Sequence, residues 1–166
     1  HWPTPCSPIR YKAWPMTFTL AIRHFRHGWA DISLTFGPEN LEFSASAVAN
    51  DPLEELAELG VALLTGGSLP RQATFWLEPE GYDLLAWSQD GATWLALRYA
   101  ECAFARLWEP IETRAKAVVT KRAVAHELHR ALEACKDAVQ LVNGTPHWCY
   151  PYPEALTAKL GAELQS

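Results

Sequence analysis

The sequence predicts a single α+β domain built on a mostly antiparallel sheet of six or seven strands. Several short segments alternate apolar and polar residues, which is typical of strands that bury one face of a sheet. Two longer segments carry apolar residues at helical spacing, and each follows a group of strands. The predicted order is three strands and a helix, then three or four strands, a long helix and a short one. We expect the strands to form two meander halves, with all helices on one face.

The first group of strands follows Met16. Period-two alternation predicts strands over residues 17–22, 31–36 and 41–46, with a turn at the Gly-Pro-Glu-Asn stretch 37–40. The apolar positions of these strands are Phe18, Leu20, Ile22, Ile32, Leu34, Phe36, Leu41, Phe43 and Ala45. Such a meander buries one face and leaves the other in contact with water.

The helix after these strands has clear signals at both ends. Asp51 can cap its first turn, Pro52 suits the first helical position, and Glu54 stands where a capping box places an acid. Gly66 and Gly67 are expected to end it.

The second group of strands is richer in aromatic residues. Strands are predicted over residues 73–77, 82–87 and 93–99, and Asp90-Gly91 predicts a tight hairpin between the last two. Residues 111–118 alternate in a way that favours one more strand, although they can also open a long helix. That helix is clearest from Lys121 to Leu141, and a final short helix is expected after Pro153.

The first fifteen residues differ from the rest, with four prolines, two tryptophans and no periodicity. Met16 is the only methionine, so we expect residues 1–15 to be a leader of artificial or upstream origin and residues 16–166 to be the domain. The alternative is a genuine arm that packs on the domain through Trp2 and Trp14.

Composition excludes some classes of function. The chain of 166 residues is 49% apolar and 20% charged, which is ordinary for a globular protein, and its formal charge of −5 disfavours a nucleic-acid surface. No apolar run approaches a membrane span, and no secretory signal is recognisable. The four cysteines form no CxxC pair, so we expect free buried thiols in the cytoplasm, with one disulfide as the alternative.

Parts of the layout are similar to a known family. These are Asp51-Pro52-Leu53-Glu54-Glu55-Leu56, the hairpin over 75–98, the long helix, and Pro151-Tyr152-Pro153-Glu154-Ala155-Leu156. From about Thr17 to Leu164 the chain resembles an uncharacterised family of small bacterial proteins. Some similar proteins act as immunity proteins beside bacterial toxins. The resemblance implies a binding protein and transfers no functional residue.

The long helix contains His126-Glu127-Leu128-His129, which invites comparison with zinc-protease motifs. Its histidines lie at i and i+3, whereas the protease motif needs i and i+4. A metal-dependent hydrolase would need His147 or Cys149 as a further ligand. Our main interpretation is that the helix residues are solvated on its outer face, so we predict no catalytic residue, no metal site and no cofactor.

The tryptophans of the second group form the candidate site. If Leu84 faces the helices, the pleat places Trp76, Trp87 and Trp94 together on the opposite face of the sheet. Glu78 and Asp83 are the acids expected at its rim. This surface is either open to a ligand or covered by the leader, by the segment with Trp148 and Tyr150, or by a second copy of the chain.

These observations favour a non-enzymatic cytoplasmic protein that binds another protein, in its most concrete form an immunity-type inhibitor of a bacterial toxin. One alternative is a structural module that associates with itself through the tryptophans. The other is the metal-dependent hydrolase. We expect neither nucleic acid nor membrane among the partners.

Overall fold

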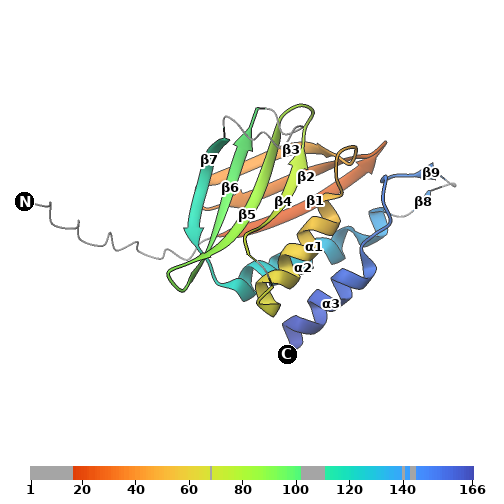
Figure 1. Ribbon diagram of the computed structural model, residues 1–166. Helices are drawn as coiled ribbons and strands as arrows, with labels where there is room; N and C mark the ends of the chain where they lie inside the picture. Colours follow the sequence, from red (N-terminus) through yellow and green to blue (C-terminus); the bar gives the residue numbers. More distant parts are fainter. Residues whose placement is uncertain (1–16, 68, 102–110, 140, 143–144) are drawn as a thin grey trace, which may run out of the picture.

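The computed structural model describes residues 17–67, 69–101, 111–139, 141–142 and 145–166. Over these residues the chain forms an open antiparallel sheet of seven strands, a separate pair of two-residue strands, and three helices (Figure 1). The predicted α+β fold is confirmed. The prediction for residues 1–15 lies outside the described residues.

The sheet strands are β1 (Phe18–Arg26), β2 (Trp29–Phe36), β3 (Glu39–Ser46), β4 (Arg71–Trp76), β5 (Gly81–Gln89), β6 (Ala92–Ala100) and β7 (Ile111–Val118). The small pair is β8 (Leu141–Val142) and β9 (Thr145–Pro146), and the helices are α1 (Pro52–Thr65), α2 (Lys121–Val139) and α3 (Glu154–Gln165).

The seven strands lie in the sheet in chain order, so each one pairs with the next. The predicted hairpin at Asp90-Gly91 is present, with positive φ at both residues, as a type I′ turn requires. His27 and Gly28 form the same kind of turn between β1 and β2. In Figure 1 the twist of the sheet carries β5–β7 across the direction of β1–β3.

The uncertain segment 111–118 is a strand, β7, which forms one edge of the sheet. The long helix ends at Val139, two residues before the predicted end, because Leu141 and Val142 belong to the small β8–β9 pair. None of the helices among the described residues has the length and apolar character needed to cross a membrane.

Both predicted ends of α1 are present. The carboxylate of Asp51 accepts a hydrogen bond from the backbone N–H of Leu53 at 3.1 Å, and Gly66 ends the helix in the left-handed conformation. The same carboxylate also accepts from the indole Nε1 of Trp148 at 3.2 Å. Burial raises the pKa of Asp51, and these hydrogen bonds offset part of the effect.

All three helices lie on one face of the sheet, and the core lies between (Figure 1). Helix α1 packs on β4, whereas α2 packs on β1 at the far edge. Helix α3 packs against α1, where Gly60 has no Cβ and the methyl groups of Leu160 fill the space. Leu160 is consequently fully buried.

The sheet is weakest between β3 and β4, where Ser46 and Trp76 are the one residue pair in register. Beyond that pair, side chains near the start of α1 take the place of a strand. Glu55 accepts a hydrogen bond from the backbone N–H of Thr74 at 2.7 Å, and Asn50 donates one to the Thr74 carbonyl at 2.8 Å. The backbone N–H and carbonyl of Thr74 are thereby satisfied without a neighbouring strand.

The same chemistry closes the edge strand β1. Glu127 of α2 accepts a hydrogen bond from the Leu20 N–H at 2.8 Å, and Arg130 donates one to the Leu20 carbonyl at 2.7 Å. Glu127 and Arg130 also form an ion pair at 2.6 Å. An exposed strand edge is a template for unwanted pairing, and this ion pair occupies it at Leu20.

Candidate functional site

The face of the sheet opposite the helices, which we call the helix-free face, carries both candidate sites. Leu84 belongs to the core beneath the helices, and Trp87, three residues further along β5, lies on the helix-free face. Trp76 and Trp94 share this face, because Trp94 is the partner of Trp87 and Trp76 pairs with Gly81, which shares its face with Trp87.

Trp87 and Trp94 form the centre of the aromatic site. Their rings are stacked, with centroids 6.0 Å apart and an interplanar angle of 13°. Both are half-buried. The ammonium group of Lys116, on neighbouring β7, lies 5.4 Å from the ring centroid of Trp94, within the range of a cation–π contact. We call these two rings the tryptophan pair.

The other three predicted contact residues have different environments. Trp76 is only 8% exposed, and Asp83 is completely buried in an ion pair with Arg98 at 2.6 Å. Burial raises the pKa of Asp83, and Arg98 counteracts part of that rise. Glu78 is exposed and accepts a hydrogen bond from the hydroxyl of Ser46 at 2.8 Å, so it lies at the β3–β4 junction.

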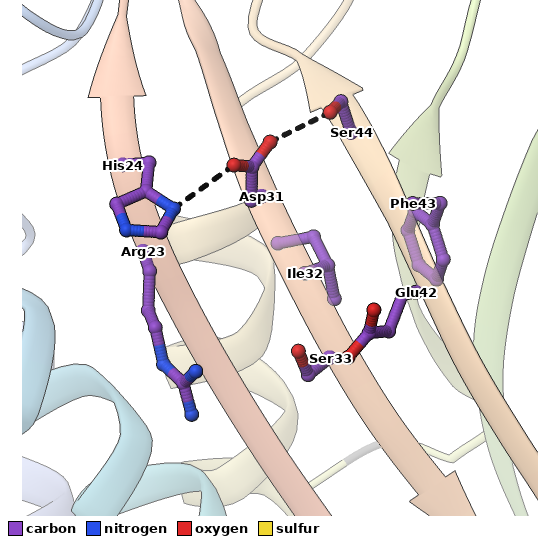
Figure 2. A pocket seen from close by; sticks show the side chains of 8 residues that line it. All are labelled: Arg23, His24, Asp31, Ile32, Ser33, Glu42, Phe43 and Ser44. Atoms are coloured by element: carbon purple, nitrogen blue, oxygen red, sulfur yellow. Dashed lines mark hydrogen bonds and ion pairs between the residues drawn. The ribbon is translucent and has the colours of Figure 1, made fainter.

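The second site is a hollow on the helix-free face of β1, β2 and β3, with a volume of about 350 Å³ (Figure 2). It is lined by Arg23, His24, Asp31, Ile32, Ser33, Glu42, Phe43 and Ser44. We refer to it as the Asp31 hollow.

Asp31 joins the three strands at one end of the hollow. It accepts a hydrogen bond from the hydroxyl of Ser44 at 2.7 Å on one oxygen, and the other oxygen lies 3.0 Å from Nδ1 of His24. Arg26 is 3.6 Å away. The hydrogen bond from Ser44, with smaller effects of His24 and Arg26, holds the pKa of Asp31 below its ordinary value despite partial burial.

A β-bulge gives His24 its position. His24 and Phe25 together oppose the single residue Ala30, and His24 has a φ of 52°, in the left-handed region. The extra residue lets Arg23 and His24 lie on the same face, although they are consecutive, while Phe25 returns to the core. Glycine is the usual residue at such a position, so the bulge places an imidazole at some conformational cost.

The order in which His24, Asp31 and Ser44 are hydrogen-bonded decides whether they can act as a hydrolytic triad. In a hydrolytic triad the histidine lies between the acid and the hydroxyl, so that it can take the hydroxyl proton. Here Asp31 lies in the middle, and Ser44 donates to the carboxylate. Ser44 is therefore not activated as a nucleophile, and the arrangement is suited to binding by hydrogen bonds and charge.

The residues of the hydrolase alternative are held by separate structural contacts. His129 packs against Gly161 of α3, and the His147 carbonyl accepts from the N–H of Gly28 in the β1–β2 turn. The expectation that Glu127 is solvated was wrong, because it binds the edge of β1. Among the residues that the structure describes, no three His, Cys, Asp or Glu side chains are grouped to hold a metal ion.

Of the cysteines, Cys135 and Cys149 fall within the described residues, and both are free thiols. Cys135 is buried in α2, as expected, and burial raises its pKa to about 12, which makes it an unreactive thiol. Cys149 is exposed, contrary to the expectation of burial. Cys6 and Cys102 lie outside the described residues.

Comparisons with family models, curated proteins and solved structures found no match to this chain.

The Asp31 hollow was not foreseen from the sequence. Asp31 and Ser44 are ordinary polar residues on the wet side of alternating strands, and that pattern carries no signal for a site. Their pairing depends on the β2–β3 register, and the contribution of His24 depends on a bulge. The one visible signal is that His24 interrupts the alternation of β1 just after Arg23.

Proposed function

We propose that this chain is a non-enzymatic protein that binds another protein through the tryptophan pair, Trp87 and Trp94. The observation that carries the proposal is the pair itself: two large stacked rings, half-exposed, on a face that the helices leave uncovered. Tryptophan is enriched among the residues that dominate binding energy at protein interfaces, because its flat ring buries a large area at little entropic cost.

The surroundings of the pair favour a protein over a small molecule. Lys116 lies against the ring of Trp94 and Gln89 accepts from the indole N–H of Trp87, so polar groups border the apolar rings. An apolar centre with a polar rim is the usual anatomy of a protein interface. Trp76 and Asp83 are buried, so we assign them to support the strands that carry the pair.

The class of partner is proposed from the family resemblance and from charge. Some proteins similar to the resembled family are immunity proteins, and the formal charge of −5 would draw a basic partner to this chain. We therefore propose a cytoplasmic inhibitor of a bacterial toxin as the specific form of this function.

The test uses Trp87→Ala, with Trp29→Ala as the matched control. Trp29 is also half-buried and also on the helix-free face, but it lies in the β1–β3 half of the sheet. A partner captured from the source cells would be identified, purified and titrated against the three folded proteins. We expect Trp87→Ala to weaken binding at least tenfold and Trp29→Ala to leave it unchanged.

Two results would contradict the proposal. One is equal binding by the wild type and Trp87→Ala. The other is a homodimer in sedimentation experiments that Trp87→Ala separates into monomers, because the tryptophan pair would then be a subunit interface.

A further inference from the structure

The Asp31 hollow contains two unpaired charges of opposite sign. Arg23 on β1 and Glu42 on β3 both line it, and neither side chain makes an ion pair or hydrogen bond with any of the described residues. Strand β2 runs between them, and Arg23 pairs with Asp31 whereas Glu42 pairs with Ser33, so the two residues lie two strands and two residue positions apart.

Figure 2 shows how these two groups are directed. The guanidinium of Arg23 and the carboxylate of Glu42 lie on opposite sides of Ser33, which projects from β2 between them. Ser33 pairs with Glu42 across the β2–β3 ladder, which fixes this arrangement. Across β1, β2 and β3 the hollow therefore presents the cation of Arg23, the hydroxyl of Ser33 and the anion of Glu42, in that order.

The opposite end of the hollow is fixed by the Asp31 network. Ser44 and His24 hold the Asp31 carboxylate, and the bulge holds His24. Both oxygens of Asp31 are therefore already engaged, one by Ser44 and the other by His24, and Arg26 lies 3.6 Å away. Arg23 and Glu42 thus remain as the two charged groups of the hollow that form no ion pair with the described residues.

We propose that the Asp31 hollow binds a small zwitterion of the α-amino acid type. The ligand carboxylate pairs with the guanidinium of Arg23, in the planar geometry that arginine offers to carboxylates, and its ammonium group pairs with Glu42. Ser33 lies between the two and can serve the ligand carboxylate as a hydrogen-bond donor. The side chain of the ligand lies toward His24, Asp31 and Ser44.

Size and exposure agree with this class of ligand. A volume of about 350 Å³ is at the small end of ligand pockets, which suits a single amino acid. Arg23, His24 and Glu42 are exposed, so water competes for both charges and binding is expected to be weak.

The test is a titration of the isotopically labelled protein with each standard L-amino acid, followed by amide resonances in NMR spectra. The best-binding amino acid is then compared with its N-acetyl derivative, which lacks the cation, and its amide, which lacks the anion. We expect shifts centred on Ser33 and Ser44, and at least tenfold weaker binding by either derivative.

Four variants complete the test. Arg23→Gln and Glu42→Gln should each weaken binding at least tenfold, whereas Arg114→Gln on β7 and Glu39→Gln at the start of β3, both outside the hollow, should not. The proposal is overturned if no amino acid binds, if a derivative binds as well as its parent, or if the two pairs of variants behave alike. Trp87→Ala should bind the amino acid normally, so this result is independent of the protein partner.

Discussion

His24 shows how much a single residue contributes to the helix-free face. Its left-handed backbone costs an ordinary L-residue about 1–2 kcal/mol, although histidine, asparagine and aspartate tolerate the region better than most. In return the bulge directs the imidazole of His24 toward Asp31. Without the bulge, the alternation of β1 would have placed this imidazole on the core side of the sheet. A residue kept in an unfavourable conformation at the edge of a hollow is consistent with a role in that hollow.

The backbone strain at His24 can be measured. His24→Gly should unfold at the same urea concentration as the wild type or at a higher one. His24→Asn should unfold at nearly the same urea concentration as the wild type. The free energy of unfolding of His24→Val should be lower than that of the wild type by about 1–2 kcal/mol, because a β-branched residue disfavours positive φ. Equal stability of the glycine and valine variants would contradict the assigned conformation.

At the scale of elements, the helices do more than cover the core. Glu55 of α1, with Asn50 just before this helix, hydrogen-bonds to β4 where β4 lacks a neighbouring strand. Glu127 and Arg130 of α2 do the same for β1. In both cases a carboxylate accepts from an N–H, and a second side chain donates to the carbonyl of the same residue. The helix side of the molecule therefore satisfies open backbone groups of one edge strand, β1, and of the central strand β4, in addition to covering the core.

The contribution of Glu127 depends on pH. Burial alone would raise its pKa, but hydrogen bonds from Arg130 and Leu20 and the charge of Arg130 outweigh burial, and the net pKa lies below the ordinary 4.5. A carboxyl group whose pKa is lower in the folded state stabilises the fold above its unfolded pKa. That stability is lost as the pH falls through the folded pKa.

We therefore expect Glu127→Gln to destabilise the protein by about 1–3 kcal/mol near pH 7, and by less as the pH falls below about 4.5. Urea unfolding of both proteins across this pH range measures the difference. A difference that stays constant with pH would mean that the charge of Glu127 contributes nothing.

Gly60 shows how closely α1 and α3 approach. A Cβ at this position would lie 2.7 Å and 3.0 Å from the two methyl carbons of Leu160. Replacing a helical glycine by alanine usually stabilises a helix by up to about 1 kcal/mol, but here we expect Gly60→Ala to cost about 1–3 kcal/mol.

The matched background for this variant is Leu160→Ala, which removes the methyl groups. In that background Gly60→Ala should be neutral or stabilising, so the double-mutant cycle should give a coupling energy of at least about 1 kcal/mol. Additive effects would show that Leu160 is not what excludes a side chain at position 60.

At the scale of the whole molecule, each half of the sheet is covered by the helix that follows the other half in or near the chain order: α1 packs on β4, and α2 packs on β1. Only one residue pair connects β3 to β4, yet the helix of the first half packs on β4 and the helix of the second half packs on β1. Each half thus covers the apolar face of the other. Neither half can bury its core alone, so the weak strand junction does not divide the molecule into two folding units.

This arrangement predicts a single unfolding transition. Tryptophan fluorescence and far-ultraviolet circular dichroism should give coincident urea curves, because loss of either half exposes the other. A fragment covering residues 17–67, which carries β1–β3 and α1, should remain unfolded by itself. Separated curves or a folded fragment would show that the halves are independent.

The sequence predicted the strands, the Asp90-Gly91 turn and the Asp51 cap because each depends on neighbours within a few residues. The Asp31 hollow, the closure of β1 by Glu127 and the β3–β4 junction depend on residues far apart in the chain. Alternation placed Trp87 and Trp94 on one face, but it carried no information on the burial of Asp83, which follows from its pairing with Arg98 on the next strand.

The closure of β1 also has a consequence for biosynthesis. Glu127 follows Leu20 by 107 positions, so a ribosome working at roughly 5–20 residues per second adds it on the order of 5–20 s later. During that interval the nascent chain contains the segments of β1, β2 and β3 without the helix α2 that packs on β1, so we expect their apolar residues to stay exposed. We expect chaperones that bind extended apolar segments to bind the segments of β1, β2 and β3 at this stage. Slower translation would lengthen the time for which the chain depends on these chaperones.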